Sequence, residues 1–293
     1  MPTVTSSSTS SHGSLYLGLL LVFSLFFVSP SLFAQSSGDN PAAPSLQVHP
    51  WQGAHVAVFG DSISDPSFRD RGVKHYWSFL QEWLGWSVYN YAISGRQWND
   101  IPRQEGALKR EHGDDVDGIL ILMGTNDYNH DVPLGEWFKV EKVSVPASND
   151  GTPATPKVRL HRVPCMDSET LRGRINKALY EIKQDYPTVP VVLMTLPHRG
   201  YFYAGENNVQ PDEYHANSLG LWVDGYSEAI REAGRIWAVP VVDLETLLGF
   251  TPMVPSQKAY YLGNDGNDFL HPATPGHERM ARILFHALSS VPL

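Results

Sequence analysis

Short apolar runs alternate with longer amphipathic stretches along the chain from about residue 51 onward. This alternation predicts strand–helix units and an α/β fold with a parallel sheet. The third and fourth apolar runs contain almost no polar residue, which is typical of central strands covered on both faces. The five predicted strands are residues 55–59, 87–91, 118–123, 189–195 and 239–244.

Stretches with helical spacing lie between these runs and after them. Ser168, beside Asp167, is expected to open one helix, and Pro275 follows Thr274 in the first turn of the last. Residues 142–165 break the pattern with frequent Pro, Ser and Thr, so we expect an excursion there, such as a small hairpin. The predicted helices are residues 74–84, 101–111, 168–186, 214–237 and 274–290.

The N-terminal segment predicts export. Residues 1–37 contain no Asp, Glu, Lys or Arg, and their apolar run at 15–28 is shorter than the roughly 20 residues of a membrane span. Cleavage after Ala34 gives a signal peptide at 1–34, a flexible lead-in at 35–50 and one folded domain at 51–293. The mature protein would then be periplasmic, cell-surface or secreted, without stable membrane insertion. Because the leader lacks Lys and Arg, an uncleaved signal-anchor is the alternative.

Composition and charge narrow the function classes. The chain has 293 residues, 42% of them hydrophobic, and 22 Lys+Arg against 31 Asp+Glu, for a net charge of -9. This composition is globular, and an acidic chain without a block of Lys or Arg gives no reason to expect a nucleic-acid partner. The single Cys165 can form neither an intramolecular disulfide nor a cysteine-based zinc site. His198, His215 and His277 have no metal-ligand spacing, so we expect no metal and no other cofactor.

Residues with acyl-transfer chemistry follow the predicted strands. Ligands of an open parallel sheet bind beyond the carboxyl ends of its strands, so these positions are the candidate site. A hydroxyl, a flexible backbone donor, an amide and a His with a nearby carboxylate are the parts that acyl transfer needs. They occur in Gly60-Asp61-Ser62, Ser94-Gly95, Gly124-Thr125-Asn126-Asp127 and, much later, Asp268-Phe269-Leu270-His271.

From residue 54 to 290 the chain resembles the SGNH/GDSL hydrolases, a family of esterases and lipases. The resemblance is carried by VAVFGDSISD, Gly95, GTND and DFLHP, in that order. It implies a flavodoxin-like three-layer α/β/α sandwich with a five-stranded parallel sheet of order 2-1-3-4-5, and ester hydrolysis without a metal. It also implies that Ser62 is the nucleophile, His271 the base and Asp268 the carboxylate that orients the base. The oxyanion hole would consist of the Ser62 N–H, the Gly95 N–H and the Asn126 amide.

The residue types suit these roles on physical grounds. A Ser hydroxyl needs a base to take its proton, and imidazole titrates in the right range. A carboxylate on the other ring nitrogen orients the His and stabilises the imidazolium. Asn126 is a neutral donor for the oxyanion, and Gly95 lets its N–H approach closely because it has no Cβ.

Each assignment has a structural alternative. Ser62 could be only a helix N-cap, Asp268 and His271 turn residues, and Asn126 a left-handed turn residue. Asp61 and Asp127 are expected to bond loop N–H groups rather than to react. The aromatic residues near strand exits suit either sugar stacking or a core. They are Trp98, Tyr128, Trp137 and Tyr201.

The expected function is that of an exported serine esterase acting on short-chain esters, such as acetyl groups on carbohydrate. Its partner would be a small-molecule or glycan ester. A lipase, phospholipase or thioesterase is the alternative among hydrolases, and transfer to an acceptor other than water would use the same residues. A catalytically silent glycan-binding protein is the alternative from another class. The sequence leaves the oligomeric state open.

Overall fold

The structure, a computed structural model, describes residues 48–67 and 72–293. The predicted signal peptide at 1–34 and most of the predicted lead-in lie outside the described residues. Residues 48 to 293 form one contact unit. Within the described ranges, no helix is both long enough and apolar enough to cross a membrane.

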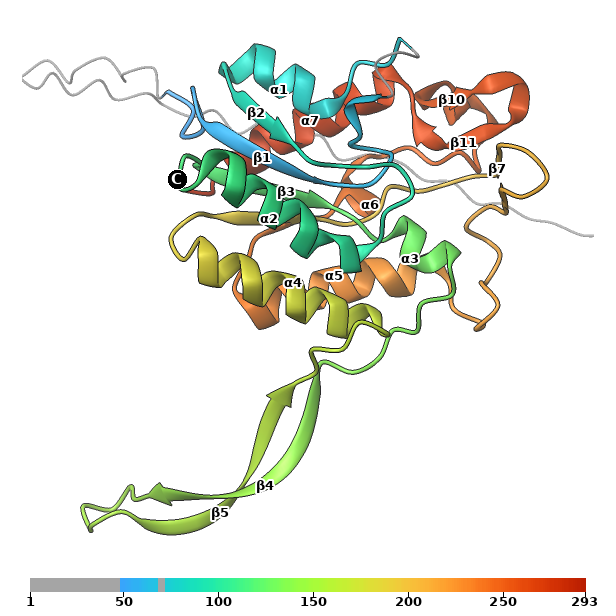
Figure 1. The fold of residues 1–293 in the computed structure, drawn as a ribbon. Coiled ribbons are helices and arrows are strands. Elements are labelled where there is room, and N and C mark those ends of the chain that lie inside the picture. Colours follow the sequence, from blue (N-terminus) through green and yellow to red (C-terminus); the bar gives the residue numbers. More distant parts are fainter. Residues whose placement is uncertain (1–47, 68–71) are drawn as a thin grey trace, which may run out of the picture. The chain divides into compact units, whose positions relative to one another are not determined.

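A five-stranded, wholly parallel sheet is the centre of the fold (Figure 1). Its order is β2-β1-β3-β6-β9, so the α/β class and the strand order implied by the resemblance are both confirmed. The last strand is shorter than predicted, since only two residues pair with β6. The strands are β1 His55–Gly60, β2 Ser87–Asn90, β3 Gly118–Leu122, β6 Val191–Met194 and β9 Val241–Val242.

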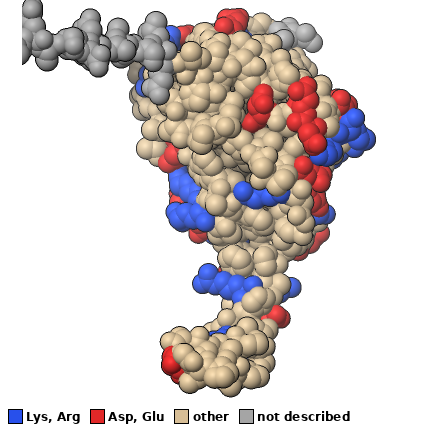
Figure 2. Space-filling view, turned by 90° about the vertical axis from the view of Figure 1, so that its left-hand side faces the viewer, with Lys and Arg blue, Asp and Glu red and all other residues tan. Residues whose placement is uncertain are grey.

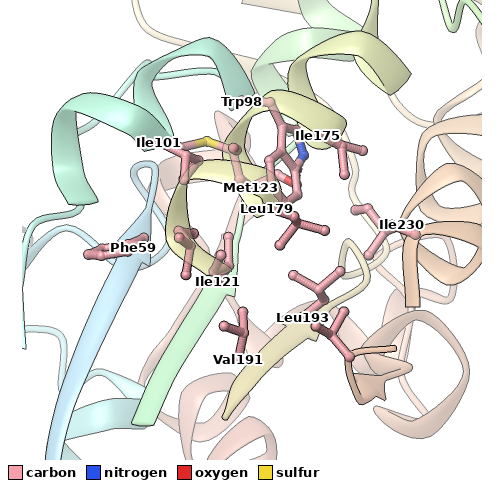
Figure 3. Packing of buried hydrophobic residues seen from close by; sticks show 14 of the residues in the cluster. Phe59, Trp98, Ile101, Ile121, Met123, Ile175, Leu179, Val191, Leu193 and Ile230 are labelled. Atoms are coloured by element: carbon pink, nitrogen blue, oxygen red, sulfur yellow. Dashed lines mark hydrogen bonds between the residues drawn. The ribbon is translucent and has the colours of Figure 1, made fainter. Parts of the chain in front are cut away.

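Helices cover both faces of this sheet, as expected for buried parallel strands. Alternate residues of β3 serve opposite faces: Ile119 and Ile121 pack in one core cluster, Leu120 and Leu122 in the other. Figure 3 shows Ile121 and Leu193 of the sheet facing Ile101, Ile175 and Ile230 of the covering helices. The helices on one face are α1 Tyr76–Leu84 and α7 Thr274–Leu288; those on the other are α2 Ile101–His112, α4 Leu171–Asp185 and α5 Val223–Trp237.

Two helices begin later than predicted, each for a local reason. α4 begins at Leu171, where Thr170 accepts a hydrogen bond from the Gly173 N–H, so Thr170 and not Ser168 is the N-cap. α5 begins at Val223 rather than near residue 214. The Asn217 side chain accepts the N–H groups of Leu219 and Leu221, and this local turn competes with a helix.

The predicted excursion is a long two-stranded hairpin. It consists of β4 Phe138–Ala147 and β5 Thr155–Pro164, antiparallel and in continuous register from Phe138↔Pro164 to Ala147↔Thr155. It extends away from the helices and the sheet (Figure 1). We call residues 138–164 the arm.

A small antiparallel sheet, which the sequence did not predict, lies beside the central one. Its order is β10-β11-β7-β8, and it carries Asp268 and His271 on β11 rather than in a turn. Its strands are β7 Phe202–Tyr203, β8 Val209–Gln210, β10 Tyr261–Gly263 and β11 Asp268–Pro272. The short helices that lie wholly within the described residues are α3 Thr125–Asn129, α6 Leu244–Leu247 and the 3-10 turns Trp98–Asp100, Pro255–Tyr260 and Asn264–Gly266.

Candidate active site

The structure brings Ser62, His271 and Asp268 into one hydrogen-bonded chain. His271 Nε2 lies 2.9 Å from Ser62 Oγ, and His271 Nδ1 lies 3.0 Å from each carboxylate oxygen of Asp268. With its proton on Nδ1, the ring donates to Asp268 and leaves Nε2 to accept the Ser62 hydroxyl. All three side chains are buried. The arrangement therefore fits proton removal from Ser62 by an oriented imidazole.

Backbone groups fix Asp268 in place. Its Oδ1 accepts the N–H groups of Leu270 at 3.2 Å and His271 at 3.0 Å, and its Oδ2 accepts from the Asn264 amide at 3.4 Å. Phe202 of β7 contacts the His271 ring edge-on, with ring centroids 5.1 Å apart. The unpredicted antiparallel sheet therefore holds the base and its carboxylate as one rigid piece.

The three predicted oxyanion donors lie on neighbouring loops. Asn126 is in α3 with ordinary helical backbone, so the left-handed turn alternative is wrong for it. Its Nδ2 donates to the Arg96 carbonyl at 3.0 Å, which ties it to the loop that carries Gly95. Gly95 has φ +79°, a backbone conformation that favours glycine. Neither the Gly95 N–H nor the Ser62 N–H bonds an acceptor among the described residues, so both are available to an oxyanion.

Asp65 joins the Ser62 loop to the Gly95 loop, a role that the sequence analysis missed. Its Oδ2 accepts the Ser94 N–H at 2.7 Å, and its Oδ1 accepts the Ser67 N–H at 2.8 Å. Asn90, at the end of β2, donates to the Ser64 carbonyl at 2.9 Å. The signal was available in the sequence, because Asp65 follows Ser62 by one turn and Asp readily bonds loop N–H groups.

Close packing fixes the end of β1, just before Ser62. A Cβ on Gly60 would lie 2.7 Å from the Leu122 carbonyl oxygen, so no larger residue fits. The buried Gln104 of α2 bonds Gly60 twice, accepting its N–H at 2.9 Å and donating to its carbonyl at 3.0 Å. The position of the Ser62 turn is thus set from both sides.

Asp61 and Asp127 hold loop N–H groups, as the sequence analysis expected. Asp61 accepts the Ile63 N–H at 3.1 Å, and Asp127 accepts the Trp98 N–H at 3.0 Å and a charged bond from Arg174 at 2.9 Å. Burial raises the pKa of Asp61 to about 7. Burial also raises the pKa of Asp127 to about 6, although Arg174 acts in the opposite direction.

A buried arginine lies near Asp61. Arg199, which follows β6, donates to Asn129 at 2.7 Å and to Gln210 at 3.0 Å, and its guanidinium lies 5.3 Å from the Tyr128 ring centroid. Burial lowers its pKa to about 10, and its positive charge lowers the pKa of Asp61. Only 1% of Arg199 is exposed.

Most of the aromatic candidates for sugar stacking are core residues. Trp98, Tyr128 and Trp137 are buried and pack in the larger core cluster, so they cannot stack on a ligand. Tyr201 is 40% exposed and Tyr203 is 39% exposed. Both flank Phe202 along the chain, and Phe202 is the residue that contacts His271.

Of the other histidines considered in the sequence, His198 and His215 have acidic partners, whereas His277 is buried against the rings of His75 and Tyr76. His198 bonds Glu213 at 2.9 Å and His215 bonds Asp212 at 2.8 Å, while burial lowers the pKa of His277 well below its usual range. No group of three His, Cys, Asp or Glu side chains within residues 48–67 and 72–293 could hold a metal ion. Cys165 is buried and unpaired.

An α/β/α sandwich with a serine, a histidine and a carboxylate joined at the carboxyl edge of its sheet belongs to the class of acyl hydrolases. The family profile of the GDSL-like lipase/acylhydrolases matches residues 58–279. The chain therefore belongs to the GDSL-like lipase/acylhydrolase family, which is a family of ester hydrolases, and the resemblance seen in the sequence is confirmed.

Solved structures agree on the fold. A protein from Lactobacillus plantarum is 26% identical with a TM-score of 0.61, and the match covers 83% of this chain and 99% of the other. A possible lipase from Chitinophaga pinensis is 20% identical with a TM-score of 0.57, and the match covers 80% of this chain and 96% of the other. No curated protein matches the chain.

Proposed function

We propose that the protein is an exported serine esterase that hydrolyses acyl esters through a covalent acyl-enzyme on Ser62. The observation that carries this proposal is the chain of contacts from Ser62 Oγ to His271 Nε2 at 2.9 Å and from His271 Nδ1 to Asp268 at 3.0 Å. A serine that needed only to cap a helix would have no use for a buried imidazole oriented in this way.

The residues divide the reaction as follows. Ser62 Oγ bonds to the ester carbonyl carbon as its proton passes to His271 Nε2, and the carbonyl oxygen becomes an oxyanion. The Ser62 and Gly95 N–H groups and the Asn126 amide stabilise that oxyanion. His271 then gives its proton to the leaving alcohol, and the acyl group stays on Ser62. Water, deprotonated by His271, attacks the acyl-enzyme and releases the acid and Ser62.

The proposed substrates are short-chain esters, above all acetyl groups on carbohydrate. Tyr201 and Tyr203 support this choice, because exposed aromatic rings suit the apolar faces of sugars and both residues adjoin Phe202 along the chain. Export rests on the leader at residues 1–34 alone. A lipase or thioesterase would use the same three residues with a longer acyl group.

A fluorophosphonate probe and two substrate series test the proposal. Intact-mass analysis should show one adduct, which peptide mapping should place on Ser62, and Ser62→Ala should show none. Activity on p-nitrophenyl esters should fall as the acyl chain lengthens, and acetylated glycan should release acetate. Rising activity with chain length would favour a lipase, whereas a folded protein with no adduct and no turnover would overturn the enzyme and favour a glycan-binding protein.

A further inference from the structure

The arm makes its polar contacts only with itself. In the described part of the chain, no hydrogen bond or ion pair joins residues 139–163 to residues outside the arm. Two paired strands of ten residues each have two open edges and no third layer. An isolated two-stranded ribbon is marginally stable in water. The arm is therefore expected to gain stability from contact with another surface.

One face of the arm carries exposed apolar side chains, with Lys142 and Arg162 among them. Side chains of a ribbon alternate between its faces, so the cross-strand register places Val140, Val158 and Leu160 on the same face. They are 61%, 70% and 73% exposed, so three neighbouring positions of one face leave large apolar side chains uncovered. At the base of the arm this face continues into a hollow of about 350 Å³ that Ile236 and Glu232 of α5 share with Val140.

Charge is separated between the arm and the rest of the chain. The arm holds 5 of the 22 Lys and Arg and 2 of the 31 Asp and Glu, so its net charge is +3 and that of the remaining chain is -12. Figure 2 shows basic side chains on the shaft of the arm, and both acidic and basic side chains on the body. Two copies of a chain of charge -9 repel each other, and the arm supplies the positive charge that offsets this repulsion.

The composition of the tip of the arm favours a protein partner over a lipid surface. Residues 147–155, Ala-Ser-Asn-Asp-Gly-Thr-Pro-Ala-Thr, contain no basic and no large apolar residue, and Asp150 lies among them. A hairpin that enters a lipid surface needs apolar residues at the end that enters. Here the apolar side chains lie along the flank instead, which suits a contact along the surface of another folded chain.

We propose that the arm is the contact element of a homodimer, in which the apolar face of each arm packs on the acidic body of the second copy, over the hollow at the base of the partner's arm. Because the arm and the hollow adjoin, two copies related by a twofold axis exchange arms reciprocally and the assembly closes. The chain thus carries both halves of the contact. Reciprocal packing covers Val140, Val158 and Leu160 and places basic side chains of each arm beside acidic ones of the other body.

Sedimentation of the full-length protein, produced in export-competent cells, tests the proposal. A dimer of twice the mass of the purified chain is expected, and it should dissociate more readily at high salt. Val140→Thr/Val158→Thr/Leu160→Thr keeps residues that suit strands and should weaken association by roughly 100-fold or more. The matched control is Val143→Thr/Val145→Thr/Val163→Thr on the opposite face, which should leave association unchanged.

Circular dichroism and turnover of a soluble ester establish that each variant is folded. A protein that stays monomeric at all concentrations overturns the proposal, as does a dimer that the apolar-face variant leaves intact. A monomer that binds vesicles of anionic lipid through the same three residues also overturns it, and assigns the face to a membrane instead.

Discussion

The carboxyl edge of the sheet and the arm differ in what their polar groups bind. At the edge, Asp65 joins the Ser62 segment to the Gly95 segment, Asn126 bonds the Gly95 segment, and His271 joins the Asp268 segment to Ser62. In the arm, each strand bonds only the other. Cross-bonding of separate segments fixes atoms relative to one another, which acyl transfer needs, whereas an element bonded only to itself is free to serve a contact elsewhere.

Removal of the proposed nucleophile should cause the largest loss of activity. Ser62→Ala should lower kcat by roughly 10⁴-fold or more, because neither attack nor the acyl-enzyme is possible without Oγ. The folded structure should persist, since Ser62 bonds only His271 through its side chain. Steady-state kinetics and a thermal unfolding curve measure both effects. A variant that retains more than a tenth of the activity would assign the reaction to another group.

The oxyanion donor comes next in size. Asn126→Ala should lower kcat by about 10²- to 10³-fold with little change in KM, since the lost donor acts mainly on the charge of the transition state. The fluorophosphonate labelling rate should fall as well. Asn129→Ala, one helical turn further along α3, removes a different polar contact of the same helix, the bond from Arg199, and serves as the comparison. Equal loss in both variants would mean that α3 is simply disrupted.

Asp65 tests whether joining the loops matters to the rate. Asp65→Asn keeps the shape but can accept at only one of its two positions, so either the Ser94 or the Ser67 N–H loses its acceptor. We expect kcat to fall about tenfold, in line with the cost of one unsatisfied buried group. KM should change little, because Asp65 bonds loop backbone rather than a reacting group. An unchanged kcat would mean that the Gly95 loop is positioned without it.

The sequence predicts the residues of the edge that stand in local motifs, but not those whose roles depend on distant partners. Ser62, Gly95 and Asn126 were found because each stands in a short motif at a strand exit, and Asp268 and His271 because they stand three residues apart in DFLHP; the structure joins Ser62, His271 and Asp268. Asp65 and the antiparallel sheet were missed, since their roles depend on backbone partners far away in the chain. Two-residue strands such as β7 have no periodicity to detect.

Burial limits prediction in a second way. The sequence offered Trp98, Tyr128 and Trp137 equally as ligand contacts or as core, because side-chain direction at a strand exit depends on tertiary packing. The arm was predicted as a small hairpin at 142–165, but its strands extend over 138–164. Apolar and polar residues alternate only irregularly along these strands, and Pro, Ser and Thr are frequent. A ribbon with no buried face does not require a regular alternation.

Buried acidity is a further difference between the regions, because the edge holds buried carboxyls. The pKa of Asp61 is about 7 in the folded protein and 3.8 when exposed. Between these values the folded state keeps a proton that the unfolded state loses, so this group makes stability fall as pH rises from about 4 to about 7. Each unit is worth about 1.4 kcal/mol, which sets an upper limit of roughly 4 kcal/mol.

Asp61→Asn should remove this contribution. Urea unfolding should show a smaller loss of stability between pH 4.5 and pH 8 in the variant than in the wild type, because Asn does not titrate. The Asn side-chain oxygen can still accept the Ile63 N–H, so the turn should keep its structure. Glu169→Gln, at an exposed site, should keep the wild-type slope. Identical slopes for Asp61→Asn and the wild type would show that Asp61 is already ionised at low pH.

Deletion of most of the arm is the largest change to the chain, and we expect it to have the smallest effect on catalysis. Replacing residues 140–162 by Asn-Gly joins Lys139 to Val163, which already face each other in the ribbon, through a two-residue turn. Because the arm bonds nothing at the edge, kcat/KM on a soluble acetyl ester should stay within about twofold of the wild type. The same protein should sediment as a monomer.

The two readouts of this deletion separate the regions. Lost activity with a normal unfolding curve would show that the arm supports the edge through association, so the twofold contact would be part of the working enzyme. Lost activity with a lowered unfolding midpoint would show instead that Phe138 and Trp137, which pack on the core at the base of the arm, were disturbed. Retained activity in a monomer requires that the edge is complete within one chain, as its internal hydrogen bonds indicate.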